Sequence, residues 1–107
     1  MDAQLKRGVL EICVLAALRR RDSYGYQIIK DVSPVIEISE STLYPILKRL
    51  EGAECVAVYS VEHNGRLRKY YRLTGTGRMR IRLFLAQWRQ MMSVYAFIER
   101  SNADDKG

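Results

Sequence analysis

Residues 41–51 read STLYPILKRLE, and their apolar side chains recur with the three- and four-residue spacing of a helix. The spacing predicts a helix over about residues 40–52, preceded by capping residues in the run Ser39-Glu40-Ser41. Pro45 fits near the first turn, where its missing N–H has little to bond. The predicted buried side carries Leu43, Ile46, Leu47 and Leu50. The predicted outward side carries Thr42, Tyr44, Pro45, Lys48 and Arg49.

Two further helices are expected before this one. Residues 3–21 place apolar side chains on two adjoining rows, which predicts a helix buried on more than one side, with three arginines at its end. Asp22 and Ser23 are favourable N-caps for a short helix through about Val32, and Pro34 ends it. The second and third helices are therefore candidates for a helix-turn-helix.

After the third helix, the pattern changes to the alternation that is typical of strands. Residues 56–62 and 67–73 are predicted strands, and Asn64-Gly65 between them favours a tight hairpin turn. Thr74 caps a last helix over about residues 76–100, and the polar residues 101–107 are expected to form a flexible tail. We predict one compact domain, mainly α with a two-stranded β-wing. A winged helix-turn-helix (residues 1–75) is followed by a C-terminal dimerisation helix.

The positive charge of the chain is concentrated in one stretch. The net charge is +6 over 107 residues, and no Asp or Glu lies between His63 and Glu99. The basic residues of that stretch are Arg66, Arg68, Lys69, Arg72, Arg78, Arg80, Arg82 and Arg89. This segregation indicates a polyanionic partner, although a solvated basic face explains the composition about equally well.

Other features bound the class of protein. The longest apolar stretch, residues 9–18, is interrupted by Glu11 and is too short to span a membrane. The opening Met-Asp-Ala-Gln lacks the pattern of a secretory signal, so we expect a cytoplasmic protein. Cys13 and Cys55 are expected to be small buried hydrophobes, with a redox role for Cys55 as the alternative. Because His63 is the only histidine, no metal site is expected.

The start of the third helix and the hairpin carry the candidate DNA-binding residues. Hydroxyl groups there can donate to phosphates or base edges, and a helix N-terminus attracts phosphate. The set is Ser39, Ser41, Thr42, Tyr44, Pro45, Lys48, Asn64, Gly65, Arg66, Arg68 and Lys69. The sequence leaves three alternatives open: Ser39 or Ser41 serves only as a cap, Tyr44 packs on the helix surface, and Lys48 or Arg49 is simply solvated. Tyr71 and Leu73 are expected to belong to the core.

These residues resemble the PadR family of transcriptional regulators over nearly all of residues 4–98. The similarity is carried by residues 7–11 (RGVLE), 24–30 (YGYQIIK), 41–51 (STLYPILKRLE) and 65–74 (GRLRKYYRLT). The resemblance implies a repressor that docks its third helix in the major groove, with the wing beside it. It also implies a dimer in which the last helix packs against the first helix of the other subunit. The short form, with one helix after the wing, is similar to multidrug-responsive members.

One position departs from the pattern of the family. Glu54 and Cys55 occupy places that usually hold glycine and an apolar residue, and Gly52 comes two residues early. Glycine at such a position supplies the positive φ that ends a helix. We therefore expect this chain to build the exit from its third helix in another way.

The last helix has an apolar seam that is typical of a helix–helix interface. With residues of the first helix, the predicted dimer interface is Leu5, Val9, Ile81, Phe84, Leu85, Trp88, Met91, Tyr95 and Ile98. A helix buried within its own chain would look similar. Trp88 either packs in this seam or serves as a stacking surface for a planar aromatic effector, with Ile12, Met91 and Met92 nearby. In some members of the family the corresponding tryptophan has the second role.

Two other classes of function are less consistent with the residues. A winged-helix module for protein interaction would have an apolar or acidic third helix and an uncharged wing. An enzyme would need a carboxylate pair, a nucleophile with a base or a phosphate-binding glycine loop, and Gly75-x-Gly77 is only the start of a helix. We expect no enzyme activity and no cofactor. The partners expected are double-stranded DNA with an inverted repeat, a second copy of the chain and a small planar aromatic effector. A metal- or redox-sensing regulator is the runner-up.

Overall fold

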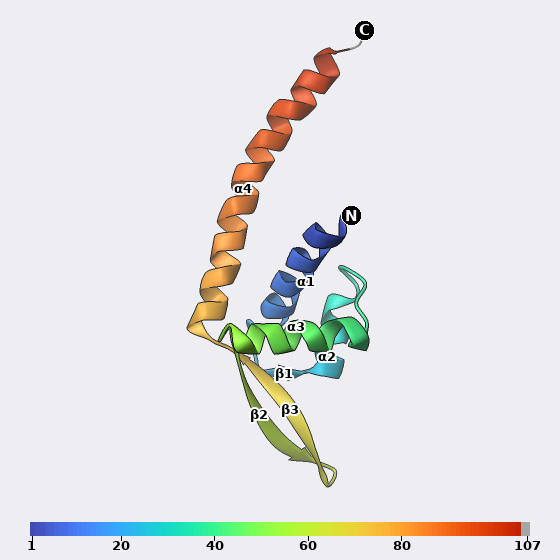
Figure 1. Cartoon of the computed structure of the whole chain (residues 1–107), viewed down its shortest axis with the longest axis vertical. Coiled ribbons are helices and arrows are strands. Elements are labelled where there is room, and N and C mark those ends of the chain that lie inside the picture. Colours follow the sequence, from blue (N-terminus) through green and yellow to red (C-terminus); the bar gives the residue numbers. More distant parts are fainter. Residues whose placement is uncertain (106–107) are drawn as a thin grey trace.

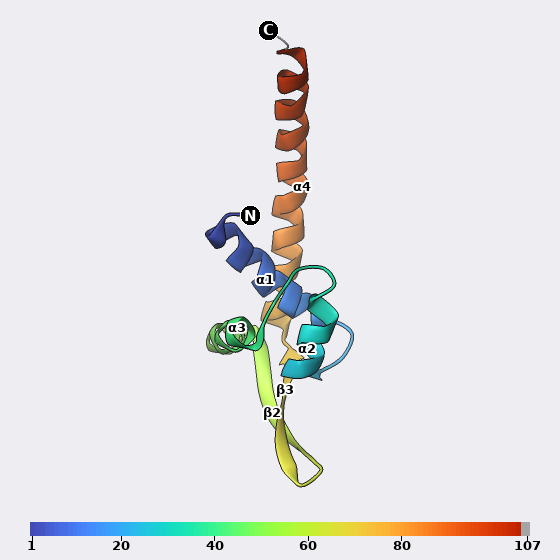
Figure 2. The ribbon, with the colours of Figure 1, turned by 90° about the vertical axis from the view of Figure 1, so that its right-hand side faces the viewer.

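The computed structural model describes residues 1–105, which fold into helices packed on a small antiparallel sheet (Figure 1). The elements are α1 (Ala3–Ala17), β1 (Ser23–Tyr24), α2 (Gly25–Val32), α3 (Glu40–Gly52), β2 (Val56–His63), β3 (Arg66–Leu73) and α4 (Gly75–Asp104). The predicted mainly α winged helix-turn-helix with a C-terminal helix is confirmed. Figure 2 shows the wing (β2 and β3) and α4 extending in opposite directions from the body formed by α1, α2 and α3.

The start of α2 differs from the prediction. Ser23 was expected to cap this helix, but it lies in β1 and pairs with Tyr71, and Tyr24 pairs with Tyr70. The sheet therefore has three strands in the order β1-β3-β2 instead of two. Extended backbone at Ser23 satisfies its peptide groups in the ladder, and the buried side chain is unavailable as a cap. The helix begins at Gly25 after Tyr24, which makes no side-chain cap.

The ends of the first and last helices also differ. α1 ends at Ala17, so Arg19, Arg20 and Arg21 lie in the following turn and not in the helix. α4 continues to Asp104 and not only to Arg100, because no proline or glycine interrupts the stretch after Arg100 before that point. Of the predicted tail, residues 101–104 are thus helical, and Lys106 and Gly107 lie outside the described residues.

The core lies between the three helices of the body and the root of the wing. Leu43, Ile46, Leu47 and Leu50 of α3 are buried, as the spacing predicted. They belong to one cluster with Leu10, Val14, Leu15, Leu18, Ile28, Val32, Ile38, Cys55, Val56, Tyr71, Leu73 and Ile81. Of α4, only Ile81 belongs to this cluster, and the helix projects far beyond the body in a molecule of 68 × 26 × 21 Å. Among residues 1–105, no helix is both long and apolar enough to cross a membrane.

The exit from α3 corrects the expectation drawn at Glu54. This residue itself adopts the positive φ of a glycine, at 60°. The amide of Cys55 donates to the carbonyl of Leu50 at 2.8 Å, and the amide of Glu54 donates to the carbonyl of Glu51 at 2.9 Å. Those two bonds define a Schellman motif, so the usual helix end is kept without glycine, and the left-handed backbone costs about 1–2 kcal/mol.

The hairpin turn and the start of α4 follow the sequence closely. Asn64 and Gly65 both have positive φ, at 52° and 78°, and a two-residue hairpin turn of type I′ requires positive φ at both of these positions. His63 pairs with Arg66 across the turn. Thr74 caps α4 by accepting a hydrogen bond from the amide of Gly77 at 3.1 Å. The same hydroxyl donates to the carbonyl of Glu54 at 2.7 Å, which joins the end of α3 to the start of α4.

Candidate nucleic-acid interface

The N-terminal part of α3 presents a cluster of exposed hydroxyl groups. The hydroxyl oxygens of Ser39 and Ser41 are 3.0 Å apart, and Ser39 donates to Thr42 Oγ1 at 3.2 Å. Ser39 occupies the N-cap position, yet its side chain makes no capping hydrogen bond. The hydroxyl of Ser39 therefore orients its neighbours on the outer face of α3 and does not close the helix end.

Tyr44, Pro45 and Lys48 extend this outer face along α3, and all three are exposed. Pro45 is the sixth residue of the helix, one turn later than expected, so the carbonyl of Ser41 lacks its usual intrahelical donor. Tyr44 is about half exposed, and its hydroxyl contacts Gly25 of α2. Tyr44 is therefore packed only at its hydroxyl end, as the packing alternative predicted in part, and the rest of its ring is open to solvent.

The basic side chains of the wing are of two kinds: some are exposed, and one is held against an aromatic ring. Arg66 and Lys69 are exposed. Arg68 is half-buried, with its guanidinium 4.1 Å from the centre of the Tyr24 ring, a cation–π contact. Asn64 and Gly65 form the exposed tip. The sequence placed Arg68 with the other cations but did not show that an aromatic ring holds it.

An aromatic ladder anchors the wing to the body, and sequence reasoning missed it. Tyr70 stacks on Tyr59 with ring centres 5.8 Å apart, and it meets Tyr24 at 5.5 Å. The hydroxyl of Tyr59 donates to Asp22 at 2.6 Å, and this bond raises the pKa of Tyr59. Cross-strand aromatic pairs stabilise a sheet. The three tyrosines fix the orientation of the wing relative to α2.

A groove of about 800 Å³ separates α3 from the wing. Its lining includes Tyr44 of α3, Gly25 and Tyr26 of α2, and a run of wing residues from His63 to Lys69. The charged lining groups are Arg66, Arg68 and Lys69, with no carboxylate among them. Of the predicted α3 residues, only Tyr44 lines this basic concave surface, together with the predicted wing residues Asn64, Arg66, Arg68 and Lys69. The hydroxyl cluster, which precedes Tyr44, and Lys48, which follows it, lie outside the groove.

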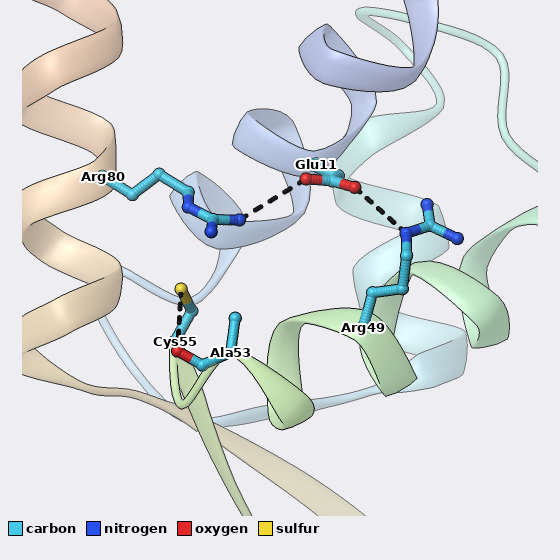
Figure 3. A network of polar contacts seen from close by, with 5 residues as sticks. All are labelled: Glu11, Arg49, Ala53, Cys55 and Arg80. Atoms are coloured by element: carbon cyan, nitrogen blue, oxygen red, sulfur yellow. Dashed lines mark hydrogen bonds and ion pairs between the residues drawn. The ribbon is translucent and has the colours of Figure 1, made fainter.

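Glu11 of α1 fixes the position of α3 (Figure 3). Its carboxylate accepts from Arg49 Nε at 3.2 Å and from Arg80 of α4 at 3.5 Å. Arg49 is therefore ion-paired, which differs from the solvated side chain that the sequence left open. The position of Glu11 among apolar residues in α1 was a signal that its carboxylate is paired, but its two partners lie 38 and 69 residues away.

The outer part of α4 is apolar and uncovered. Trp88, Leu85, Met91, Met92, Tyr95 and Ile98 are all between 45% and 58% exposed. Phe84 stacks on Trp88 with ring centres 5.8 Å apart. Ile81, predicted in the same seam, is 4% exposed because it packs in the chain's own core, so it has little surface left for a partner. On α1, Leu5 is exposed, and Val9 and Ile12 are half-buried.

Neither cysteine has the surroundings of a reactive thiol. Cys55 is fully buried, and its thiol contacts the carbonyl of Ala53 at 3.8 Å (Figure 3). Burial raises the pKa of Cys13, which disfavours the reactive thiolate. In the part of the chain that the structure describes, no three His, Cys, Asp or Glu side chains are grouped as metal ligands would be.

Comparison with known proteins places these features in a family. The family model described as "Transcriptional regulator PadR-like family" matches residues 14–83, from the last turn of α1 into α4. The chain is similar to a PadR-like transcription factor from Bacteroides fragilis, with 32% identity and a TM-score of 0.81 over 90% of this chain and 95% of that one. A PadR family regulator from Eggerthella lenta shares 34% identity, with a TM-score of 0.80 over 89% and 85% of the two chains. An uncharacterized protein of Lysinibacillus sphaericus is 32% identical over 82% of this chain and 85% of its own length.

Proposed function

The chain belongs to the PadR-like family of transcriptional regulators, and from this premise we propose that it is a dimeric repressor of an inverted-repeat operator. The protein is a DNA-binding transcriptional regulator and not an enzyme. The proposal adds that α3 docks in the major groove, with the wing against the neighbouring backbone. The observation that carries it is the groove without carboxylates between α3 and the wing, lined by three cations.

We expect two kinds of contact at this surface, one with backbone phosphates and one with base edges. Lys48, Arg66 and Lys69 are exposed, and their long cationic side chains suit sequence-independent contacts with phosphates. Thr42 is short, exposed and held by Ser39, which suits a base edge in the major groove. Asn64 and Gly65 form a narrow tip that can approach the backbone or the minor groove. Arg68, held over Tyr24, adds charge to the lining of the groove.

We propose that two copies of the chain associate through α4. An exposed apolar band as long as the one from Leu85 to Ile98 is unusual on a soluble monomer and is typical of an interface. Leu5 and Val9 of α1 provide a second, smaller apolar surface for the partner's α4. A dimer with twofold symmetry imposes an inverted repeat on the operator, with half-sites about one helical turn apart. Because such a regulator must reach chromosomal DNA, we propose that the protein is cytoplasmic.

We also propose that the protein releases its operator when a planar aromatic compound binds near Trp88. The exposed indole ring, with Met91 and Met92 on the same face, offers a flat and adaptable apolar surface. A compound inserted between two copies of this surface would change the spacing of the two α3 helices. Ile12, half-buried on α1, completes the proposed lining.

Alanine variants test the assignment of roles in the DNA interface. Lys48→Ala and Arg66→Ala should weaken binding to all duplexes and reduce the dependence of log Kd on log salt by about one unit each. Thr42→Ala should instead change the ranking of related operator sequences. Arg20→Ala removes an exposed cation from the turn after α1 and serves as a matched control. Unchanged affinity in Arg66→Ala would show that the wing is not part of the interface.

A further inference from the structure

A second groove lies between α1 and the start of α3, away from the wing. It has a volume of about 390 Å³. Its lining combines Lys6, Arg7 and Arg49 with Ser41, Thr42 and the apolar residues Ala3, Leu10, Pro45 and Ile46. Ser41 and Thr42 thus belong both to the outer face of α3 and to this groove. Any duplex that α3 contacts through these hydroxyls also lies at the mouth of the groove.

The charge of this groove is positive. Lys6 and Arg7 are exposed, and neither has an ion-pair partner among the residues that the structure describes. The carboxylates nearest in sequence are those of Asp2, the N-cap residue of α1, and Glu11. Neither lines the groove, and both oxygens of Glu11 already accept from Arg49 and Arg80. Glu40, in the first turn of α3, does not line the groove. The cations are therefore available for an anion that approaches α3.

Arg49 is held in an orientation that suits this role. Its Nε donates to Glu11, while its two terminal nitrogens point away from that carboxylate (Figure 3). An arginine fixed through Nε retains its other donors for a second oxygen ligand. Glu11 thus positions Arg49 without occupying its terminal groups.

We propose that the groove between α1 and α3 binds a backbone phosphate of the operator strand that flanks the major groove. Arg7 and Lys6 supply the exposed charge, Arg49 supplies oriented donors, and the hydroxyls of Ser41 and Thr42 complete the site. The proposal rests on the DNA-binding function above and extends the interface from α3 and the wing to the first helix. Each protomer would clamp the duplex from both sides of α3, with the wing on one side and α1 on the other.

The test compares Lys6→Ala, Arg7→Ala and their double variant with the wild type on the duplex that the wild type selects. Each single substitution should reduce the slope of log Kd against log salt by about one unit, and the double variant by about two. Arg7→Lys should retain most of the slope. Arg20→Ala is the matched control and should leave the slope unchanged. Size-exclusion chromatography of each variant excludes an effect on assembly.

Ethylation interference locates the contact. In the wild type, ethylation of one flanking phosphate in each half-site should weaken binding, and in the double variant that phosphate should no longer matter. Unchanged salt slopes together with an unchanged interference pattern would overturn the inference while leaving the proposed function intact. A wild type that binds no duplex would overturn both.

Discussion

The hydroxyl of Tyr44 in α3 lies directly against Gly25 in the first turn of α2, so closely that a Cβ on residue 25 would overlap it. This contact sets how closely the two helices of the helix-turn-helix approach each other. It also connects a residue of the proposed DNA surface to the internal packing of the motif. The separation of α2 and α3 at this point therefore depends on glycine.

Replacing that glycine should destabilise the protein. Gly25→Ala forces the half-exposed ring of Tyr44 outward and should lower the free energy of unfolding by about 1 kcal/mol, the lower end of the range for overpacked sites, because the end of this side chain can shift. Chemical denaturation measures the change. In a Tyr44→Ala background the same substitution should have little cost, because the overlapping hydroxyl is gone. Gly8→Ala, with no atom within 4 Å of its added Cβ, is the control and should be neutral or stabilising. An equal cost in both backgrounds would contradict the contact.

The exit from α3 offers a substitution that should stabilise the chain. Glu54→Gly relieves the left-handed backbone and should raise the free energy of unfolding by about 0.5–1 kcal/mol, after the greater freedom of glycine in the unfolded state is included. Glu51→Gly, within the last turn of the same helix, should have the opposite effect, at a cost of about 0.5–1 kcal/mol. Thermal or denaturant unfolding of the pair measures both signs. Destabilisation by Glu54→Gly would show that the Glu54 side chain has a role beyond its backbone.

Much of the fold could be predicted from the sequence because its signals are local. The buried side of α3 follows from the spacing of four apolar residues, and the hairpin follows from Asn64-Gly65. β1 could not be predicted, because two residues carry no period and Ser23 is held by a partner, Tyr71, that lies 48 residues away. Glu54 was misjudged for a related reason. Glutamate disfavours a positive φ, but the hydrogen bonds that the amides of Glu54 and Cys55 donate to α3 outweigh that preference.

The candidate site was predictable in its residue types and less so in their arrangement. The outward hydroxyls of α3 and the basic wing were found from spacing and charge. The bracing of Arg68 by Tyr24 and of Arg49 by Glu11 depends on packing between distant segments, for which one sequence holds no direct signal. Ile81 shows the same limit in reverse. It has the spacing of the seam, yet it lies where α4 is still part of the body.

The proposed dimer predicts a change in assembly on altering Tyr95. This side chain is 58% exposed in the single chain and lies toward the C-terminal end of the outer apolar band. Tyr95→Glu places a carboxylate one turn from Glu99, which the Tyr95 hydroxyl contacts at 3.2 Å, so the new charge is unpaired in the interface at a cost of several kcal/mol. The variant should therefore be monomeric or insoluble at micromolar concentration. Sedimentation gives the mass. Ser93→Lys, outside the seam, should remain a dimer. A soluble Tyr95→Glu dimer would contradict the interface.

The proposed effector site predicts a response of the only tryptophan. Planar aromatic compounds should quench Trp88 fluorescence, and those that release the operator should bind more weakly when operator is present, by the same factor. Trp88→Ala should lose the response to such compounds but retain operator affinity. If no compound in a broad panel of planar aromatics perturbs the fluorescence of the wild type, Trp88 serves packing alone.

The central claim is that α3 and the wing of a symmetric dimer bind a specific duplex. The most direct test is selection of duplexes from a random pool by the purified protein, followed by a salt titration on the selected sequence. We predict an inverted repeat with half-sites about one helical turn apart, and a log Kd that changes steeply and linearly with log salt. A pool that shows no enrichment, together with an affinity for duplex that does not change between low and moderate salt, would contradict the claim.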